Sequence, residues 1–345
     1  MNDQTTQSPE PFSALSPDLI LDAIDSIGIH SDGRLLALNS YENRVYQAGV
    51  EDAAPLVAKF YRPARWSDEA ILEEHAFVQT LADAEIPVVP ALILNNTSLS
   101  NPSINNEPTL HHYQGYRFSL FAKHGGRAPE LDREGVLEWI GRFIGRIHAV
   151  GGLATFKERP TLDIESFGRE PSTYLLANRF IPQELEEVYR GVVKQALEGV
   201  QRCFDRAGDV AQLRLHGDCH MGNLLWTDDG PHFVDFDDSR MGPAVQDLWM
   251  MLSGERDEMK AQLNDLLYGY EDFCEFNPRE IHLIEALRTL RLIHYAGWIA
   301  RRWDDPAFPL AFPWFNTQNY WQDRILELRE QIALMDEPML LPGNF

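Results

Sequence analysis

The stretch that decides the fold is Leu215-His216-Gly217-Asp218-Cys219-His220-Met221-Gly222-Asn223, followed by Phe233-Val234-Asp235-Phe236-Asp237. Apolar residues alternate with the polar ones, which predicts short strands whose ends hold the polar side chains at the mouth of a cleft. Phosphoryl transfer requires a carboxylate that orients the attacking hydroxyl, oxygen ligands for magnesium, and a cation for the nucleotide phosphates. Because the first two are present here, the stretch predicts a site for ATP and Mg²⁺.

The spacing of the polar residues suggests a role for each. Asp218 precedes Asn223 by five residues, as in the Asp-x-x-x-x-Asn pattern of kinase catalytic loops, so Asp218 is the predicted catalytic base. Asn223 and Asp235 offer hard oxygen ligands and are predicted to share the magnesium. Asp235 is therefore expected to act in catalysis through the metal, with Asp237 close enough in sequence to assist.

A structural explanation exists for each of these residues taken singly. An Asp or Asn in a turn between strands commonly accepts hydrogen bonds from the local backbone. The combination favours catalysis, because His-Gly-Asp-x-His-x-x-Asn followed by a strand that ends in Asp-x-Asp seldom arises by chance. His216 and His220 are expected to fix the loop by hydrogen bonds, and Cys219 to serve in packing.

At this point the chain resembles the protein-kinase-like phosphotransferases, which include aminoglycoside, choline and homoserine kinases and share the His-Gly-Asp loop. Four segments, at residues 39–46, 57–63, 215–220 and 242–249, are more closely similar to the bacterial stress response kinase A family. The likeness spans nearly the whole chain. It implies a cytosolic serine/threonine protein kinase that uses Mg-ATP and acts in envelope and oxidative stress survival.

Composition indicates an enzyme in a reducing compartment. The 345 residues are enough for two lobes. The net charge of −23 argues against nucleic acid and anionic membranes as partners, although it does not decide between attraction of a cationic substrate and simple solubility. Residues 1–14 lack the features of a secretory signal, and the three cysteines form neither a disulfide framework nor a zinc motif. We therefore expect a cytoplasmic monomer.

The first third of the chain predicts a small antiparallel sheet. A helix is expected at residues 17–27, strands at 34–39, 44–48, 55–61 and 116–121, and a second helix at 67–84. Lys59 lies on the third strand in Val57-Ala58-Lys59, which resembles the kinase strand whose lysine contacts the nucleotide phosphates; an exposed strand lysine is the alternative. A buried lysine needs a partner. Glu73 and Glu74 point about 100° apart on one helix, so only one of them can face Lys59. We expect Glu74 to be this partner, because the family pattern favours it.

Two loops are expected to complete the nucleotide site. No Gly-x-Gly-x-x-Gly precedes Lys59, so residues 39–44 must cover the phosphates. Ser40 and Asn43 are the predicted contacts, against the alternative of a simple hairpin turn. Residues 122–126 are the expected hinge, where backbone groups from Phe121 to Lys123 would bind adenine unless this is a plain surface turn. Residues 92–110 predict a hairpin or flexible loop of unknown role.

The remainder of the chain predicts a helical lobe. Helices are expected at 132–150, 182–207, 255–274, 278–303 and 317–335, with Gly141 and Gly145 allowing close helix packing. Asp247 resembles a kinase aspartate that braces the catalytic loop from behind, or is an ordinary helix N-terminal acid. The prediction is a two-lobed α+β fold with an N-lobe at residues 1–121, a hinge at 122–126 and a C-lobe at 127–345.

The phosphate acceptor stays open at this stage. A protein side chain is the main expectation, with ATP as the other partner. A small alcohol of the choline, homoserine or aminoglycoside type is the first alternative, because no Ala-Pro-Glu landmark follows Asp235. A nucleotide-binding regulatory protein with vestigial catalysis is the second, and the complete set of Asp218, Asn223 and Asp235 argues against it.

Overall fold

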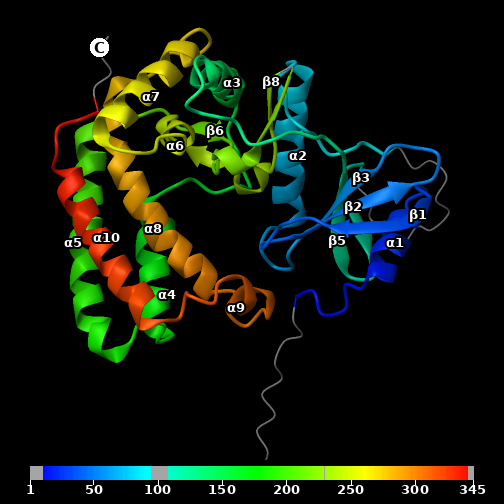
Figure 1. The fold of residues 1–345 in the computed structure, drawn as a ribbon, viewed down its shortest axis with the longest axis horizontal. Helices are drawn as coiled ribbons and strands as arrows, with labels where there is room; N and C mark the ends of the chain where they lie inside the picture. The colour runs from blue at the N-terminus through cyan, green and yellow to red at the C-terminus, as the bar shows by residue number, and fades with distance from the viewer. Residues whose placement is uncertain (1–10, 95–107, 229, 341–345) are drawn as a thin grey trace, which may run out of the picture.

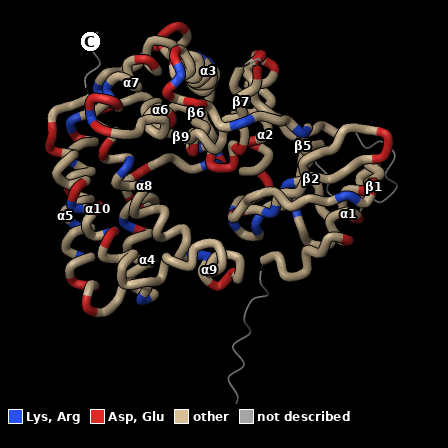
Figure 2. Tube along the Cα trace, viewed as in Figure 1, with Lys and Arg blue, Asp and Glu red and all other residues tan. Residues whose placement is uncertain are grey.

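The computed structural model describes residues 11–94, 108–228 and 230–340. It has a sheet-rich part joined to a larger helical part, as Figure 1 shows. Most of the loop predicted at residues 92–110 lies outside the described residues. None of the described helices is long and apolar enough to cross a lipid bilayer. Figure 2 shows Asp and Glu distributed over both parts of the molecule, with Lys and Arg interspersed.

The first part is a five-stranded antiparallel sheet in the order β1-β2-β3-β5-β4. Its elements are α1 (Pro17–Asp25), β1 (Ser31–Ala37), β2 (Arg44–Val50), β3 (Leu56–Phe60), α2 (Asp68–Asp83), β4 (His111–Tyr113) and β5 (Tyr116–Ala122). Ala58 and Phe60 are buried in one cluster with Ile20 and Ile24 of α1. Because side chains alternate along a strand, Lys59 points to the opposite face of the sheet.

The helical part combines eight α-helices with two short strand pairs among the described residues. The helices are α3 (Val136–Gly151), α4 (Glu170–Ala177), α5 (Gln183–Ala207), α6 (Val245–Trp249), α7 (Arg256–Tyr270), α8 (Ile284–Ala300), α9 (Ala307–Ala311) and α10 (Gln318–Met335). Two short strand pairs, β6 with β9 and β7 with β8, lie among them. Their bounds are β6 (Leu213–Leu215), β7 (Leu224–Thr227), β8 (Gly230–Phe233) and β9 (Arg240–Gly242).

The predicted helices are found with small shifts of their ends. The one expected at residues 278–303 is divided, because Pro278–Leu283 forms a 3₁₀ helix before α8 begins at Ile284. Gly141 and Gly145 do permit close packing: a Cβ at either would collide with the carbonyl oxygen of Leu266 or Tyr270 in α7. The aromatic residues Phe308, Phe315 and Trp321 are part of the buried core.

The main hydrophobic core extends across the two parts. Phe77, Val78 and Leu81 of α2 belong to the same buried cluster as Ile140 and Ile144 of α3. The helix that follows the lysine strand is therefore packed against the helical part as well as covering the sheet (Figure 1). The lobe boundaries at residues 121 and 127 stay predictions, since the apolar core is continuous across them.

Candidate active site

The loop that carries Asp218 is fixed from behind by Asp247 of α6. The two carboxylate oxygens of Asp247 accept the backbone N–H groups of His216 and Gly217 at 2.8 and 2.9 Å. Gly217 has a φ of +86° and lies so close to the carbonyl oxygen of Asp238 that a Cβ would collide with it. The bracing position predicted for Asp247 is confirmed.

The histidines of the loop hold the backbone, as expected. His216 is fully buried, and its Nε2 lies 3.0 Å from the carbonyl oxygen of Val234. His220 Nδ1 accepts the N–H of Gly222 at 2.9 Å. Cys219 is also buried, and burial raises the pKa of its thiol well above the ordinary value, so the packing role is confirmed.

Asp218 points into the cleft with its side chain 23% exposed. Its Oδ1 accepts a hydrogen bond from Nη1 of Arg291 at 2.7 Å, and its Oδ2 lies 3.4 Å from Nε2 of His220. Burial would raise the pKa of Asp218, but the hydrogen bond from His220 and the charge of Arg291 outweigh it and hold the pKa below the ordinary value. The carboxylate is therefore ionised and able to accept a hydrogen bond from a hydroxyl.

The β7–β8 hairpin brings Asn223 and Asp235 to the same end. Leu224 pairs with Phe233, so the residues just outside this pair leave the hairpin side by side, and Val234 N–H donates to the carbonyl oxygen of Asn223 at 3.0 Å. The amide nitrogen of Asn223 donates to the carbonyl oxygen of Asp218 at 2.9 Å, which leaves its amide oxygen for a ligand. The structure thus gathers the three predicted residues at one place.

Lys59 reaches this place from the sheet. Its Nζ lies 3.0 Å from Oδ1 of Asp235 and 3.1 Å from Oδ1 of Asp237. Burial alone would lower the pKa of Lys59, but the charges of Asp235, Asp237 and Glu74 raise it well above the ordinary value. The lysine is fully charged and bridges the two parts of the molecule.

The predicted ion pair between Lys59 and Glu74 is not formed. Glu74 Oε2 lies 3.3 Å from Nη2 of Arg159, and Glu73 accepts backbone N–H groups of residues 157–159. Glu73 and Glu74 thus both hold the segment that follows α3. Glu74 acts on Lys59 only through its charge, because aspartates far along the chain occupy the direct position.

The turn between β1 and β2 uses its polar side chains internally. Ser40 Oγ donates to the carbonyl oxygen of Asn43 at 3.2 Å. The amide oxygen of Asn43, 4% exposed, accepts the backbone N–H of Arg62 at 3.0 Å. The Asn43 amide oxygen is thus used within the turn, but both Ser40 and Asn43 line the cleft, so their contact with the phosphates stays a prediction.

The predicted hinge is an exposed connection. Phe121 pairs with Val57 of β3 on one side and bridges Ala91 on the other, so it lies between two paired segments. Lys123 begins the exposed residues that lead to Arg127, which pairs with Trp226 of β7. Of the two predicted adenine contacts, Lys123 is the more exposed residue and lies beyond the end of β5.

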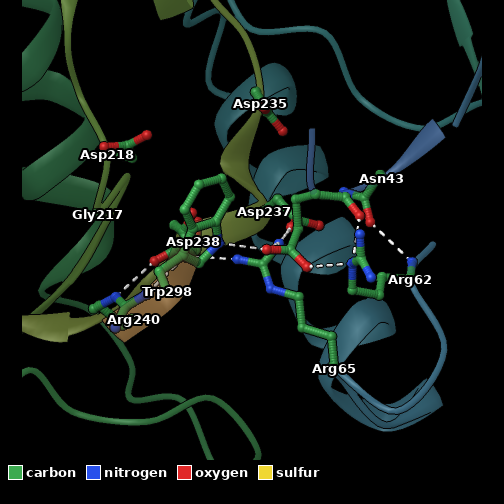
Figure 3. A network of polar contacts seen from close by, with 12 residues as sticks. Asn43, Arg62, Arg65, Gly217, Asp218, Asp235, Asp237, Asp238, Arg240 and Trp298 are labelled. Carbon is green, nitrogen blue, oxygen red and sulfur yellow. Dashed lines mark hydrogen bonds and ion pairs between the residues drawn. The ribbon is translucent and has the colours of Figure 1, made fainter. Parts of the chain in front are cut away.

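Sequence reasoning missed a group of arginines that surrounds the acidic loop. Arg65 forms ion pairs with Asp237 and, at 2.9 Å, with Asp238, and Arg240 Nη2 lies 2.8 Å from Asp238 (Figure 3). Burial would raise the pKa of Asp237, but Arg65, Lys59 and Arg159 lower it to about 2. Nothing in the local pattern of the sequence announced these pairs, because Arg65 and Asp237 are 172 positions apart.

One cavity of about 590 Å³ lies between the sheet-rich and helical parts, and its wall includes Arg65 and Arg240 of the arginine group. Its wall includes the predicted residues Ser40, Asp218, Asn223 and Asp235. The rest comes from the β1–β2 turn, the arginine group and one face of α8. A concave site with converging carboxylates and an amide oxygen, next to a buried lysine, is suited to binding a metal-complexed phosphate group.

The chain belongs to the phosphotransferase enzyme family, because the model of that family matches residues 34–287. The fold agrees: the solved structure titled amicoumacin kinase hAmiN in complex with AMP-PNP, Ca²⁺ and Ami has a TM-score of 0.67. The alignment covers 90% of each chain at 18% sequence identity. The protein is thus an enzyme of the kinase type, for which ATP is the co-substrate that the family implies.

Within this family the chain is similar to Stress response kinase A of Escherichia coli (strain K12). The two are 43% identical over 329 residues, which cover 95% of this chain and 96% of the relative. It is equally similar, at 43% identity and the same coverage, to a Salmonella typhimurium (strain LT2) protein named serine/threonine protein kinase RdoA. The resemblance noted in the sequence is confirmed.

Proposed function

We propose that the protein is a cytoplasmic serine/threonine protein kinase of the bacterial stress response that transfers the γ-phosphate of Mg-ATP to a hydroxyl. The observation that carries the proposal is the convergence of Asp218, Asn223 and Asp235 on one cavity, with Lys59 paired to Asp235 beside it. The names of the relatives support the protein acceptor. The net charge of −23 supports the absence of a nucleic-acid partner, and the monomeric state is part of the proposal.

The donor set fits a magnesium ion. Mg²⁺ in nucleotide sites takes one or two protein oxygens together with phosphate oxygens and water. Asn223 offers an amide oxygen and Asp235 a carboxylate that is 56% exposed, and both lie at one end of the β7–β8 hairpin. When bound, the ion would neutralise charge on the transferring phosphoryl group.

Each protein group has a distinct task in the proposed mechanism. Asp218 accepts a hydrogen bond from the acceptor hydroxyl, orients it in line with the γ-phosphorus and takes its proton. The acceptor oxygen forms the new bond to phosphorus while the bond to the bridging oxygen breaks, so ADP leaves. Lys59 aligns the phosphates, Ser40 belongs to the turn that covers them, and backbone groups near Lys123 bind adenine.

A small-molecule acceptor is the second candidate. The structure of amicoumacin kinase resembles this fold, yet a likeness at 18% identity concerns the fold alone. The 590 Å³ cavity is large enough for either kind of acceptor group. The similarity at 43% identity to the named protein kinase gives the protein acceptor its priority.

The test follows γ-labelled phosphate from Mg-ATP into the protein, small-molecule and free-phosphate fractions of a cell extract. Label on serine or threonine of proteins is the expected result. Label in one small metabolite alone would contradict the protein acceptor and identify the true one. Nucleotide binding without any loss of γ-phosphate would contradict catalysis itself.

A further inference from the structure

One face of α8 forms part of the wall of this cavity. The lining residues from this helix and its C-terminal extension are Arg291, His294, Tyr295, Trp298, Arg301 and Arg302. They recur every three to four positions and so share one helix face. Neither Lys59 nor the hinge at Lys123 lines this cavity. The α8 face, seen in Figure 1 running toward α9, therefore borders the space where an acceptor must lie.

This face is cationic in a strongly acidic protein. The chain has 53 Asp and Glu against 30 Lys and Arg, yet no acidic residue of α8 lines the cavity. The acids at Asp237 and Asp238 are already paired with Arg65 and Arg240. Arg301 is exposed, lies 5.4 Å over the ring of Tyr174, and forms no ion pair among the described residues. Because Arg302 is paired with Glu42, the positive charge left on this face for a ligand lies at Arg301.

Arg291 occupies the position that an acceptor hydroxyl must approach. Its guanidinium, 39% exposed, donates to Oδ1 of Asp218 at 2.7 Å. A hydroxyl that hydrogen-bonds to Asp218 must displace or share this contact. A partly buried arginine that loses its partner is destabilised, whereas a carboxylate or phosphate on the acceptor would replace the lost partner. A cationic acceptor would instead be repelled.

The length of the face indicates an extended ligand. Ten residues separate Arg291 from Arg301, which corresponds to about 15 Å along a helix. An extended peptide covers that distance in about five residues. Tyr295 and Trp298 lie between the two arginines with their rings stacked, centroids 5.7 Å apart, and provide an apolar surface. A small alcohol would contact only one end of this face.

We propose that the acceptor is an acidic segment of polypeptide. Its serine or threonine hydroxyl lies at Asp218, and acidic residues within about five positions of it pair with Arg291 and Arg301. This inference rests on the proposed kinase function and adds the charge of the substrate. Arg291 is in this view a positioning residue that releases Asp218 when an acidic acceptor arrives.

The test compares three synthetic peptides with one central serine flanked by Glu, by Gln or by Lys. The purified full-length protein and Mg-ATP are used, and KM and kcat are measured for peptide and for ATP. We expect the Glu peptide to have a KM about tenfold below that of the Gln peptide, since one charge-assisted pair accounts for about that factor. The Lys peptide should be the poorest acceptor.

Variants assign the effect to residues. Arg291→Gln and Arg301→Gln should each raise the KM for the Glu peptide about tenfold and leave the KM for ATP unchanged. Arg301→Glu should shift the preference toward the Lys peptide, and Arg291→Lys should retain part of the preference for Glu. Arg190→Gln, which changes an exposed arginine of α5, is the matched control and should change nothing.

The outcomes separate this inference from the function on which it rests. Equal KM values for the three peptides, or an unchanged preference in Arg301→Glu, would overturn the acidic-acceptor inference while transfer itself upheld the kinase. Faster transfer to a small alcohol bearing a carboxylate than to the Glu peptide would overturn the polypeptide acceptor. Absence of any transfer or ADP formation would overturn the proposed function.

Discussion

Asp235 combines an unusual backbone conformation with an exposed carboxylate. Its φ of +62° lies in the left-handed region, which few residues other than glycine, asparagine and aspartate adopt. Such strain persists where the surrounding structure enforces it, commonly at functional sites. Here the β7–β8 hairpin and the 3₁₀ turn at Phe236–Asp238 fix the residue on both sides. The conformation places the carboxylate beside Lys59, in the cleft.

Asp235→Asn should weaken the use of Mg-ATP more than the fold. A neutral amide is a poorer magnesium ligand, so the Mg²⁺ concentration for half-maximal activity should rise about tenfold or more. Thermal stability should change little because the side chain is largely exposed. The control is Asp228→Asn, an exposed acid in the adjacent turn. Normal magnesium dependence in the Asp235 variant would remove this residue from the metal site.

Sequence reasoning located the residues of the site whose geometry is local. Asp218, Asn223 and Asp235 lie close together in the sequence, where short-range spacing fixes how a turn and a hairpin place them, whereas the position of Asp247 was implied by the family resemblance. The predicted partner of Lys59, Glu74, was wrong because the direct partner Asp235 is 176 positions away, beyond the reach of local patterns. Arg291, 73 positions from Asp218, lies in a helix whose pattern shows only that it is helical.

At the scale of elements, α3 and α7 pack closely through glycine. Gly141 in α3 faces the Leu266 carbonyl, and Gly269 in α7 faces the Glu138 carbonyl. The two backbones therefore touch where any side chain would separate them. This contact supports α3, which carries His148. Because His148 Nε2 lies 3.0 Å from Asp247, the packing of α3 also supports the residue that holds the catalytic loop.

Gly141→Ala should lower the free energy of unfolding by about 2 kcal/mol, because the added methyl group collides with backbone that cannot rotate away. Gly191→Ala is the matched control. It lies in α5 with open space around its Cβ position, so alanine should stabilise the helix by up to about 1 kcal/mol. Denaturant unfolding of both variants checks the prediction. Equal effects would mean that α3 and α7 are not packed this closely.

The start of α6 depends on a buried acid. Glu280 is 2% exposed, and its Oε2 accepts the N–H of Val245 at 2.9 Å. Burial raises the pKa of Glu280 to about 7, although its hydrogen bonds from the backbone oppose the shift. Because α6 carries Asp247, the protonation state of Glu280 affects the element that holds the catalytic loop.

Glu280→Gln should therefore change stability in a pH-dependent manner. In the folded protein the neutral form is favoured, so the wild type loses stability relative to the variant as the pH rises from 4.5 to about 7. Above this range the variant should be more stable by about 3 kcal/mol, with little difference below it. Unfolding measured at several pH values provides the test, with the exposed Glu134→Gln as control. A stability difference between wild type and the Glu280 variant that does not change with pH would refute the raised pKa of Glu280.

At the scale of the whole molecule, the β1–β2 turn is attached to the helical part. Glu42 Oε2 lies 2.6 Å from Nη2 of Arg302 and accepts the indole N–H of Trp298 at 2.6 Å. Arg62, which follows β3, pairs with Glu42 at 3.0 Å and with Asp305 at 2.7 Å. These contacts close the cavity where the turn meets α8.

Glu42→Gln should loosen this closure. Loss of the charge weakens pairs that are largely buried, so amide hydrogen exchange in residues 39–43 should accelerate about tenfold or more. Exchange in α5 should stay the same. Glu51→Gln, an exposed acid at the opposite end of β2, is the control and should leave residues 39–43 unaffected. Unchanged exchange in the Glu42 variant would show that these pairs do not hold the turn.

The sequence predicts the helices and strands more completely than the contacts between the sheet-rich and helical parts. Strand alternation and helical periodicity placed most elements within a few residues, because these patterns report local burial. They could not show that Phe77 and Leu81 of α2 join the core of the helical part. They also could not show that the helix expected from residue 278 begins as a 3₁₀ helix, because its N-terminal turn is fixed by the Asn277 cap and by packing.

The most direct test of the account is the rate of phosphate transfer by Asp218→Asn beside Asp209→Asn, an exposed acid of the preceding loop. The variant at Asp218 should fold and bind ATP but transfer γ-phosphate at least about 100-fold more slowly, since it lacks the proton acceptor. The Asp209 variant should match the wild type. Unchanged transfer by the Asp218 variant would contradict the assignment of this cleft as the active site.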